Sequence, residues 1–254
     1  MTLLSVRNLT KSFGGLMAVN DVDFVLENGT VMGMIGPNGA GKTTVFNLIS
    51  GNYRPDMGEI HFNDKSVVGM ATHKIVSLGI ARTFQTIRLF PNMPVIENVL
   101  AGCHPRMRSG IFASMFRTPG QRREEQENLK VALRELEFVG LSEQAGNKAK
   151  NLSYGNQRLL EIARALASRP RLIVLDEPAG GMNVQETSDL VRLIKEIKRR
   201  GITVLLIEHD MSLVMRVCEK IIVLEHGALI ARGTPEEVQN NPRVIEAYLG
   251  MEED

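Results

Sequence analysis

Nine consecutive residues near the N-terminus combine glycines with a lysine and two hydroxyl side chains: Gly36, Pro37, Asn38, Gly39, Ala40, Gly41, Lys42, Thr43 and Thr44. The glycines allow a tight turn in which backbone N–H groups approach an anion closely. Lys42 would reach the β- and γ-phosphates as a positive charge, and the Thr43 hydroxyl would ligate Mg²⁺. An apolar run precedes this segment and a helical pattern follows it. It therefore predicts a site for a nucleoside triphosphate, and a chance match in a glycine-rich loop is the weaker interpretation.

Two acidic residues, Asp176 and Glu177, end the strand-like run 172–175. A carboxylate at a strand tip beside the phosphate loop can hold Mg²⁺, directly or through water, and Asp176 is the candidate. Glu177 would lie next to the γ-phosphate, where it would orient or deprotonate the attacking water. Two acids that end a strand at the solvent surface are the alternative. Their pairing with the phosphate loop favours the site.

Two further polar residues occupy comparable positions. His209 follows the run 204–207 and could hydrogen-bond the γ-phosphate, although a lone histidine here is more often an exposed loop residue. Gln85 ends the run 80–84, where a helical stretch begins, and could contact Mg²⁺ or water and transmit the nucleotide state. The remaining histidines form no cluster. Cys103 and Cys218 lack metal-like spacing and indicate reduced thiols.

The elements that must position these residues follow from the pattern of apolar runs. Short runs alternate with helical patterns, which predicts an α/β fold with a largely parallel sheet. Expected strands are 3–6, 22–26, 31–35, 60–62, 172–175, 204–207 and 221–224, the last entering a hairpin with 228–231. Between about 87 and 150 helical patterns dominate, including 95–100 and 121–139, and indicate an inserted helical subdomain. Helix starts are predicted at Asn183 with Glu186, at Thr234-Pro235 and at Asn241-Pro242.

Composition excludes several classes of protein. The 254 residues are 43% hydrophobic and 23% charged, as in an ordinary globular protein. A net charge of +1 argues against nucleic acid as the main partner. The N-terminus does not resemble a signal peptide, and no apolar window reaches the ~18–20 residues needed to span a bilayer. We expect a chain that is cytosolic by itself and reaches a membrane through partners.

Five motifs occur in the order and spacing of an ATP-binding cassette protein, and the chain resembles that family over essentially its whole length. They are the phosphate loop, Gln85, residues 152–157 (Leu-Ser-Tyr-Gly-Asn-Gln), residues 175–178 (Leu-Asp-Glu-Pro) and His209. The resemblance implies a P-loop NTPase (RecA-like) α/β core with an antiparallel β subdomain and an inserted helical subdomain. Residues 1–254 would form one nucleotide-binding domain, with the core in 1–86 and 159–235. The helical subdomain would span 87–158 and a helical tail 236–254.

The resemblance also assigns roles to residues. Two cassettes of this family close head to tail, so Ser153 and Gly155 would hold the γ-phosphate of ATP bound to the opposite chain. Phe13 matches the aromatic residue that stacks on adenine, and a core phenylalanine is the alternative. The other roles implied are catalytic for Glu177, His209 and Gln85, and metal-binding for Thr43, Gln85 and Asp176.

The chain departs from the common family pattern at three places. Tyr154 replaces the first glycine of the signature segment and Asn156 replaces a glutamine. Residues 179–183 (Ala-Gly-Gly-Met-Asn) replace the common Ser-Ala-Leu-Asp, which puts in doubt how the two sites communicate. Phe13 stands where tyrosine is usual and should be nearly neutral. Because Ser153 and Gly155 are intact, we expect catalysis to survive.

Residues 79–85, 88–93, 95–99, 233–238 and 247–250 resemble the branched-chain amino-acid (Liv-type) importers more specifically. That resemblance implies two transmembrane permease subunits, a second ATPase subunit or a second copy as dimer partner, and, indirectly, an external solute-binding protein. The chain would be peripheral at the cytoplasmic face of the inner membrane, and cytoplasmic when isolated. Alternatives are related urea, amide or lipopolysaccharide systems, a soluble ATPase switch as in iron–sulfur cluster assembly, and a module that holds ATP without hydrolysing it.

The segment 103–126 resembles the longer insertion found in one of the two cassettes of such importers. It interleaves arginines with apolar residues: Arg106, Met107, Arg108, Ile111, Phe112, Met115, Phe116, Arg117, Arg122 and Arg123. A basic amphipathic stretch can lie against anionic headgroups or a membrane partner. Packing onto the helical subdomain with solvated arginines is the more common arrangement.

Overall fold

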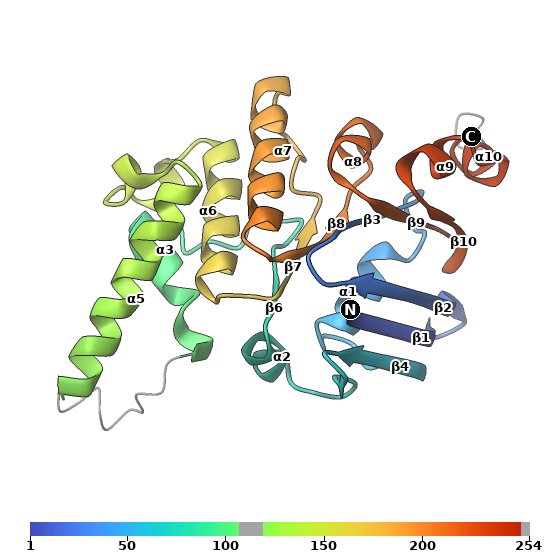
Figure 1. The fold of residues 1–254 in the computed structure, drawn as a ribbon, viewed down its shortest axis with the longest axis horizontal. Helices are drawn as coiled ribbons and strands as arrows, with labels where there is room; N and C mark the ends of the chain where they lie inside the picture. The colour runs from blue at the N-terminus through green and yellow to red at the C-terminus, as the bar shows by residue number, and fades with distance from the viewer. Residues whose placement is uncertain (107–118, 250–254) are drawn as a thin grey trace.

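Short aliphatic runs form a mainly parallel sheet at the centre of the computed structural model, which describes residues 1–106 and 119–249. Its strand order is β10-β9-β3-β8-β7-β6 (Figure 1). The strands are β3 (Val31–Ile35), β6 (Ile80–Arg82), β7 (Leu172–Asp176), β8 (Thr203–Ile207), β9 (Lys220–Glu225) and β10 (Ala228–Gly233). All neighbours pair in parallel except β9 and β10, which form the predicted hairpin. The carboxyl ends of β3, β6, β7 and β8 therefore meet at one edge, where the predicted site residues follow.

Successive residues of the central strands face two different cores. In β8, Val204 and Leu206 belong to one buried cluster, and Leu205 and Ile207 belong to the other. This alternation is the period of two expected of a strand, and burial on both faces explains the continuous apolar runs. The sheet is thus covered on both sides, and only its edge is free to carry polar chemistry.

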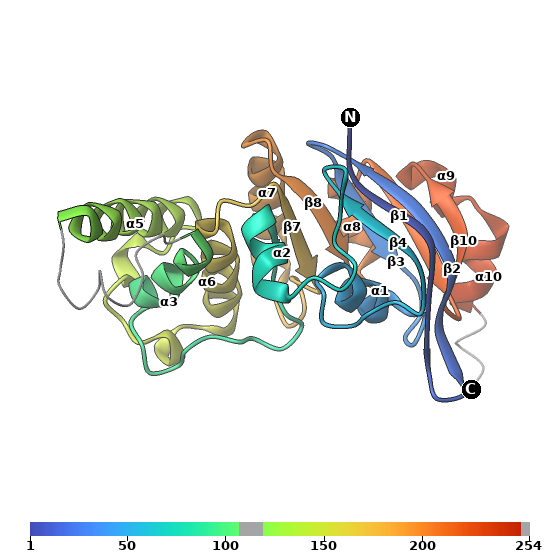
Figure 2. The same ribbon diagram turned by 90° about the horizontal axis from the view of Figure 1, so that it is seen from below.

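One core lies between this sheet and a second, antiparallel sheet of order β2-β1-β4-β5. Its strands are β1 (Thr2–Phe13), β2 (Leu16–Glu27), β4 (Met57–Phe62) and β5 (Lys65–Ser66). Helix α1 (Lys42–Ile49) is buried between the two sheets through Val45, Phe46, Leu48 and Ile49 (Figure 2). Strands β1 and β2 are longer than predicted, because pairing continues through polar positions such as Asn8 and Asp21, whose side chains hydrogen-bond at 3.0 Å.

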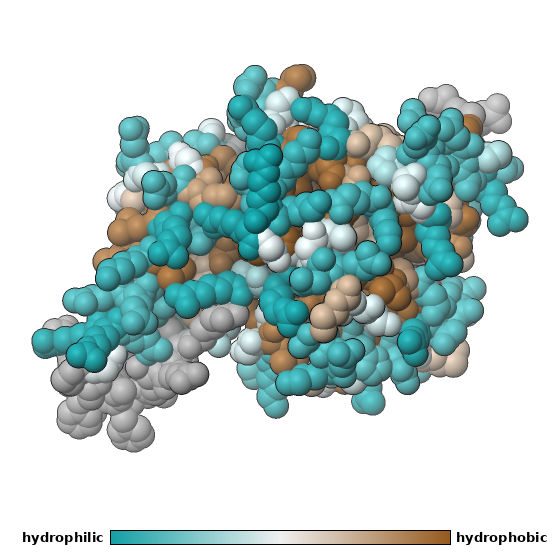
Figure 3. Space-filling model, viewed as in Figure 1, coloured by the Kyte–Doolittle hydropathy of each residue, from teal (hydrophilic) through white to brown (hydrophobic). Residues whose placement is uncertain are grey.

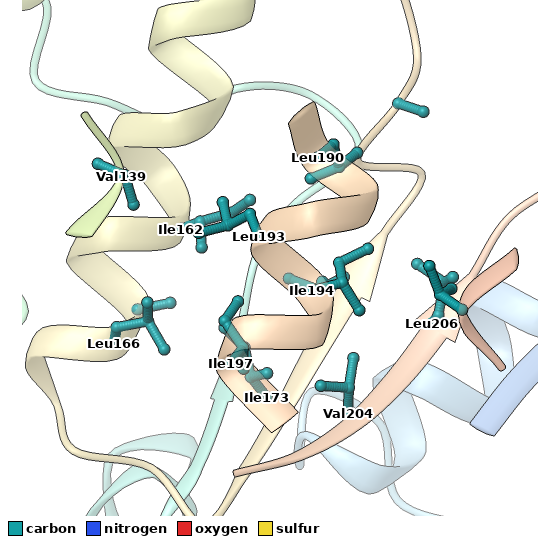
Figure 4. Packing of buried hydrophobic residues seen from close by; sticks show 14 of the residues in the cluster. Val139, Ile162, Leu166, Ile173, Leu190, Leu193, Ile194, Ile197, Val204 and Leu206 are labelled. Atoms are coloured by element: carbon teal, nitrogen blue, oxygen red, sulfur yellow. The ribbon is translucent and has the colours of Figure 1, made fainter. Parts of the chain in front are cut away.

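The other face of the parallel sheet packs against α6 (Tyr154–Ala167), α7 (Val184–Arg199) and α8 (Met211–Val217). Ile194 of α7 lies on the side of the helix that faces Val204 and Leu206 of the sheet, and Leu193 lies beside Ile162 of α6 (Figure 4). Truncating one such side chain to alanine costs about 2–5 kcal/mol. The predicted capping box is present, since Asn183 and Glu186 exchange side-chain to backbone hydrogen bonds at 2.9 Å. Helix α8 was not predicted.

Helices gather at the end of the molecule away from β1 and β2 (Figures 1 and 2). They are α3 (Val95–Ala101), α5 (Pro119–Phe138) and α6, with short 3₁₀ turns at His104–Arg106, Ser142–Gln144 and Ala149–Asn151. Among the described residues from 83 to 171 no strand forms, and Pro94 and Lys148 make an isolated bridge. The predicted fold class, an α/β core with an antiparallel sheet and a helical insertion, is confirmed. Half of the segment 103–126 interpreted as amphipathic, residues 107–118, lies outside the described residues.

Some predicted boundaries differ from the structure. Helix α6 begins at Tyr154, because the Ser153 side chain caps it. A subdomain boundary between 158 and 159 would therefore cut α6, and we propose a boundary at one end of that helix instead. Helix α2 (Thr72–Leu78) and strand β6 were not predicted. Both are short, and β6 has only three residues.

The chain ends in α9 (Pro235–Gln239) and α10 (Pro242–Leu249), and Thr234 caps α9 as predicted. Hydrophilic side chains cover most of the face shown in Figure 3, with smaller hydrophobic patches between them. Within the described residues, no helix combines the length and the apolar character needed to cross a membrane.

Candidate nucleotide-binding and catalytic site

Two glycines of the loop 36–44, Gly36 and Gly41, occupy positions that no larger residue could fill. The loop joins β3 to α1, with Gly36 at φ 147° and Gly41 at φ 98°. A Cβ atom at Gly36 would lie 2.0 Å from the carbonyl oxygen of Leu224, and one at Gly41 would lie 2.4 Å from that of Ala18. Only glycine permits this backbone approach. The loop is thereby held against β9 and β2, at a helix start whose first N–H groups have no partner within the helix.

A cavity of about 430 Å³ lies beside this loop. Its lining unites residues that the sequence predicted from separate motifs with four that it did not: Phe13, Leu16, Met17, Ala18, Asn38, Gly39, Ala40, Gly41, Lys42, Thr43, Thr44, Gln85, Glu177 and His226. Asp176, His209, Ser153 and Gly155 are not part of this lining in the described chain. The structure thus assembles the loop, Gln85 and Glu177 around one space, and it leaves the two signature residues outside it.

Lys42 is 7% exposed, and its ammonium group donates to the carbonyl oxygens of Gly36 at 2.6 Å and Pro37 at 2.8 Å. Burial lowers the pKa of Lys42, while the carboxylates of Glu177 and Asp176 act in the opposite direction. The side chain is therefore a cation already held inside the loop, next to two anions. A phosphate in the cavity would add a charged acceptor to an ammonium that is largely desolvated.

Asp176, the last residue of β7, is only 3% exposed. Its backbone N–H donates to the Thr83 hydroxyl at 3.2 Å. Burial, together with the neighbouring Glu177 carboxylate, raises the pKa of Asp176 to about 6 against the opposing effect of Arg82 and Arg158. A buried carboxylate of this kind favours a cation, so the donor chemistry fits Mg²⁺, which prefers oxygen ligands.

Glu177 adopts φ 45°, a left-handed conformation that is uncommon for a non-glycine residue. Its carboxylate accepts a hydrogen bond from the side-chain amide of Gln85 at 2.9 Å, and the His209 Nδ1 atom lies 3.9 Å away. The His209 side chain is 62% exposed. Three predicted catalytic residues from three strand ends therefore meet, with Glu177 between the other two. Strained backbone held by surrounding structure is typical of functional sites.

The buried carboxylate of Glu208 holds the backbone segments on either side of this arrangement together. It accepts hydrogen bonds from the backbone N–H groups of Ala179 at 2.9 Å and His209 at 3.2 Å. Burial raises the pKa of Glu208, and these backbone donors and His209 oppose the rise. Glu208 thus ties the segment after Glu177 to the loop that carries His209. The sequence analysis did not assign it a role.

Phe13 is 42% exposed and lines the cavity, so it is not a core residue. Tyr53 meets it edge to face, with ring centroids 5.2 Å apart. The Lys11 ammonium lies 5.4 Å from the centroid of the ring, and the exposed part of the ring offers a surface for stacking on a flat base. His226 lines the same cavity at the tip of the β9–β10 hairpin, whose Gly227 N–H donates to the Ala40 carbonyl at 3.1 Å. The hairpin was predicted, but its contact with the loop was not.

Ser153 and Gly155 lie at the start of α6. The Ser153 hydroxyl accepts from the Asn156 N–H at 3.3 Å, and Gly155 is buried against α7. A Cβ atom at Gly155 would lie 2.4 Å from the Glu186 carboxylate, so a larger residue there would require the Glu186 side chain to move. The start of a helix is physically suited to an anion, and Ser153 and Gly155 do not belong to the cavity lining described above.

Arg158, also on α6, was missed by the sequence analysis. It is 4% exposed and donates to the backbone carbonyl oxygens of Phe84, at 2.6 Å, and Gln85. Glu161, 1% exposed in its side chain, accepts from the Arg88 N–H at 3.2 Å and lies 3.5 Å from Arg158. Helix α6 therefore holds the loop that carries Gln85 through hydrogen bonds to its backbone. No local pattern could have revealed contacts between residues this far apart in the chain.

Comparison with known proteins agrees with this geometry. The model of the ABC transporter family matches residues 19–180, and that of the branched-chain amino acid ATP-binding cassette transporter family matches residues 228–253. The high-affinity branched-chain amino acid transport ATP-binding protein BraF of Pseudomonas aeruginosa is 49% identical over 249 residues, 98% of each chain.

Two solved structures extend the comparison. The ADP conformation of an ATP-binding cassette of an ABC transporter is 35% identical, with a TM-score of 0.86 over 98% of this chain and 99% of that one. A dimeric ATP-binding cassette in a post-hydrolysis state, bound to ADP and phosphate, is 25% identical, with a TM-score of 0.77 over 92% and 99%.

Fold and site together define an ATP-binding cassette. The chain belongs to the ABC transporter family, and it is an ATPase whose hydrolysis is coupled to transport. The predictions of family, fold and enzymatic class are thus confirmed.

Proposed function

We propose that this chain is the ATP-hydrolysing subunit of an importer of branched-chain amino acids. The observation that carries the enzymatic part is the meeting of Lys42, Gln85 and Glu177 at one cavity. The transported class rests on similarity, because BraF carries that transport in its name and the family model of such cassettes matches the C-terminal residues.

In this proposal the loop residues 36–44 hold the phosphates of ATP, and the exposed Phe13 ring stacks on adenine. Lys42 supplies positive charge from within the loop. Glu177 orients or deprotonates the attacking water, and Gln85 and His209 position that carboxylate and respond to the γ-phosphate. The hydrogen bond between Gln85 and Glu177 supports this assignment, since it places both side chains at the same point.

Mg²⁺ would be held by Thr43, Gln85 and Asp176, all of which offer oxygen atoms. When bound, the ion would neutralise charge that develops on the phosphates. Asp176 contributes a carboxylate whose burial is costly without a cation nearby.

We further propose that a second cassette completes the binding site for each ATP molecule. Ser153 and Gly155 are outside the cavity lining of their own chain, and the solved dimeric cassette supports the pairing of two cassettes. The partner would be a sister cassette or a second copy. Two permease subunits would bind the helical end, near Gln85 and α3, and hold the chain at the cytoplasmic face of the inner membrane. An external solute-binding protein would deliver the amino acid.

The test is to extract the tagged chain from its native membranes in mild detergent and to identify the proteins that co-purify. We expect two polytopic membrane proteins and a second cassette, and leucine-stimulated ATP hydrolysis after reconstitution with the solute-binding protein. Recovery from the soluble fraction with a scaffold protein would overturn the transport role. Stimulation by urea, an amide or a lipopolysaccharide instead of leucine would overturn only the transported class.

A further inference from the structure

Two of the three departures from the family pattern lie against each other in the structure. Tyr154, in the signature segment, packs its ring on Gly181, which belongs to the altered segment after Glu177. A Cβ atom built at Gly181 would lie 2.9 Å from Cε1 of Tyr154 and 3.3 Å from Cδ1. The ring therefore occupies the space that a side chain at residue 181 would need. Gly181 also has φ 76°, which favours glycine for a second reason.

The polar end of Tyr154 makes a separate contact. The Tyr154 hydroxyl accepts a hydrogen bond from the Arg158 guanidinium at 2.9 Å, and the same nitrogen atom of Arg158 donates to the carbonyl oxygen of Gln85. Arg158 is thus held between the tyrosine and the loop after β6. Its buried position makes these hydrogen bonds costly to lose.

These contacts form a continuous network within one chain, which begins at Glu177 and returns to the segment that follows it. Glu177 accepts from the Gln85 side chain, the Gln85 backbone accepts from Arg158, and Arg158 donates to Tyr154. The Tyr154 ring packs on Gly181, four residues after Glu177. Helices α6 and α7 make a second contact, because Gly155 of α6 packs closely against the Glu186 carboxylate of α7.

We propose that Tyr154 is a positioning residue that joins the signature segment to the segment 178–183 and to the Gln85 loop of the same chain. The inference rests on the proposed function. A change at Glu177 or Gln85 would be passed through Gly181 and Arg158 to Tyr154, and hence to Ser153 and Gly155, which serve the opposite ATP. The pair Tyr154 and Gly181 would then replace whatever link the common family sequence uses.

Steady-state ATP hydrolysis by the complex that the tagged chain forms tests this role. Because Tyr154 does not line the cavity of its own chain, Tyr154→Ala should lower kcat roughly ten- to hundredfold, the range expected for misplaced groups, and leave the KM for ATP unchanged. Tyr154→Phe keeps the ring on Gly181 and loses only the hydroxyl, so its kcat should lie between that of the wild type and that of Tyr154→Ala. If Tyr154 had only a structural role, the variants would lower thermal stability, and they would not show a graded loss of kcat at an unchanged KM.

A double-mutant cycle tests the contact itself. Gly181→Ala should lower kcat strongly in the wild-type background and by less than about twofold in the Tyr154→Ala background, because residues in contact are not additive. Gly201→Ala is the matched control, since Gly201 has φ 80° with nothing within 4 Å of an added Cβ. It carries the same backbone strain without the contact.

Additive losses in the cycle, an unchanged kcat in Tyr154→Ala, or a parallel rise in KM would each overturn the inference. A wild-type complex that hydrolyses no ATP would overturn the proposed function together with it. An active wild-type complex with unaffected variants would overturn the inference alone.

Discussion

Replacing the buried Asp176 with asparagine should make the nucleotide-free protein more stable at neutral pH. The carboxylate is 3% exposed, and its pKa is raised from 3.8 to about 6, chiefly by burial. Between those two values the folded protein keeps a proton at Asp176 that the unfolded chain has released. The folded state therefore binds more protons, and its stability falls as the pH rises through this window.

The size of the effect follows from the same values. Each tenfold change in proton affinity is worth about 1.4 kcal/mol, so the rise from 3.8 to about 6 corresponds to about 3 kcal/mol. Asp176→Asn removes the ionisable group and keeps the shape. Near pH 4 it should change the free energy of unfolding little, and above pH 7 it should add about 3 kcal/mol. Hydrolysis that depends on Mg²⁺ should be lost in the same variant.

Urea unfolding without nucleotide or Mg²⁺, followed at pH 4, 5, 6 and 7, measures this difference. Burial also raises the pKa of Glu161 and Glu208, so only the difference between variant and wild type isolates Asp176. Asp189→Asn makes the same chemical change on an exposed side chain and should shift stability by less than about 1 kcal/mol. A difference that is constant across these pH values, or a less stable variant at pH 7, would refute the electrostatic reasoning.

Three further predictions concern the site and its scaffold. Glu177→Gln should retain ATP affinity and lose about 10²-fold or more in kcat, because it removes a group that acts on water; single-turnover assays would show unchanged turnover if the role is wrong. Lys42→Ala should weaken ATP binding about 10- to 100-fold in a fluorescent nucleotide titration, since it deletes a charge-assisted contact to phosphate; normal affinity would contradict the phosphate-loop assignment. Asn183→Ala should cost about 1 kcal/mol in urea unfolding through loss of the capping box, and Gln185→Ala, on the exposed face of α7, is its control.

The parts of the fold that could be predicted are those specified by local sequence. Strand β3 was predicted with its observed bounds, because five buried residues lie directly before a glycine-rich loop. The caps at Asn183 and Thr234 were predicted because each is a short-range exchange of hydrogen bonds. In such segments propensity, capping and burial agree, which is the condition for a sequence pattern to be informative.

The parts that could not be predicted depend on contacts distant in sequence. Strands β1 and β2 extend through polar residues because each satisfies the other's backbone, and Asn8 and Asp21 adopt positive φ where the register shifts. Arg158 contacts the Gln85 loop 73 residues away. Periodicity gives a buried position on α6 but not the identity of the loop that covers it. Tertiary pairing decides both cases.

The same limit explains why the sequence analysis treated the departures at Tyr154 and at residues 179–183 as separate features. The altered segment after Glu177 put in doubt how the two sites communicate, whereas Tyr154 was expected to leave catalysis intact because Ser153 and Gly155 are present. In the structure the tyrosine ring fills the space that Gly181 leaves open. Either change alone would produce a clash with a larger residue at 181 or an empty volume beside a glycine at 154, and both cost stability. The two positions are therefore one structural feature, and a functional interpretation has to treat them as a pair.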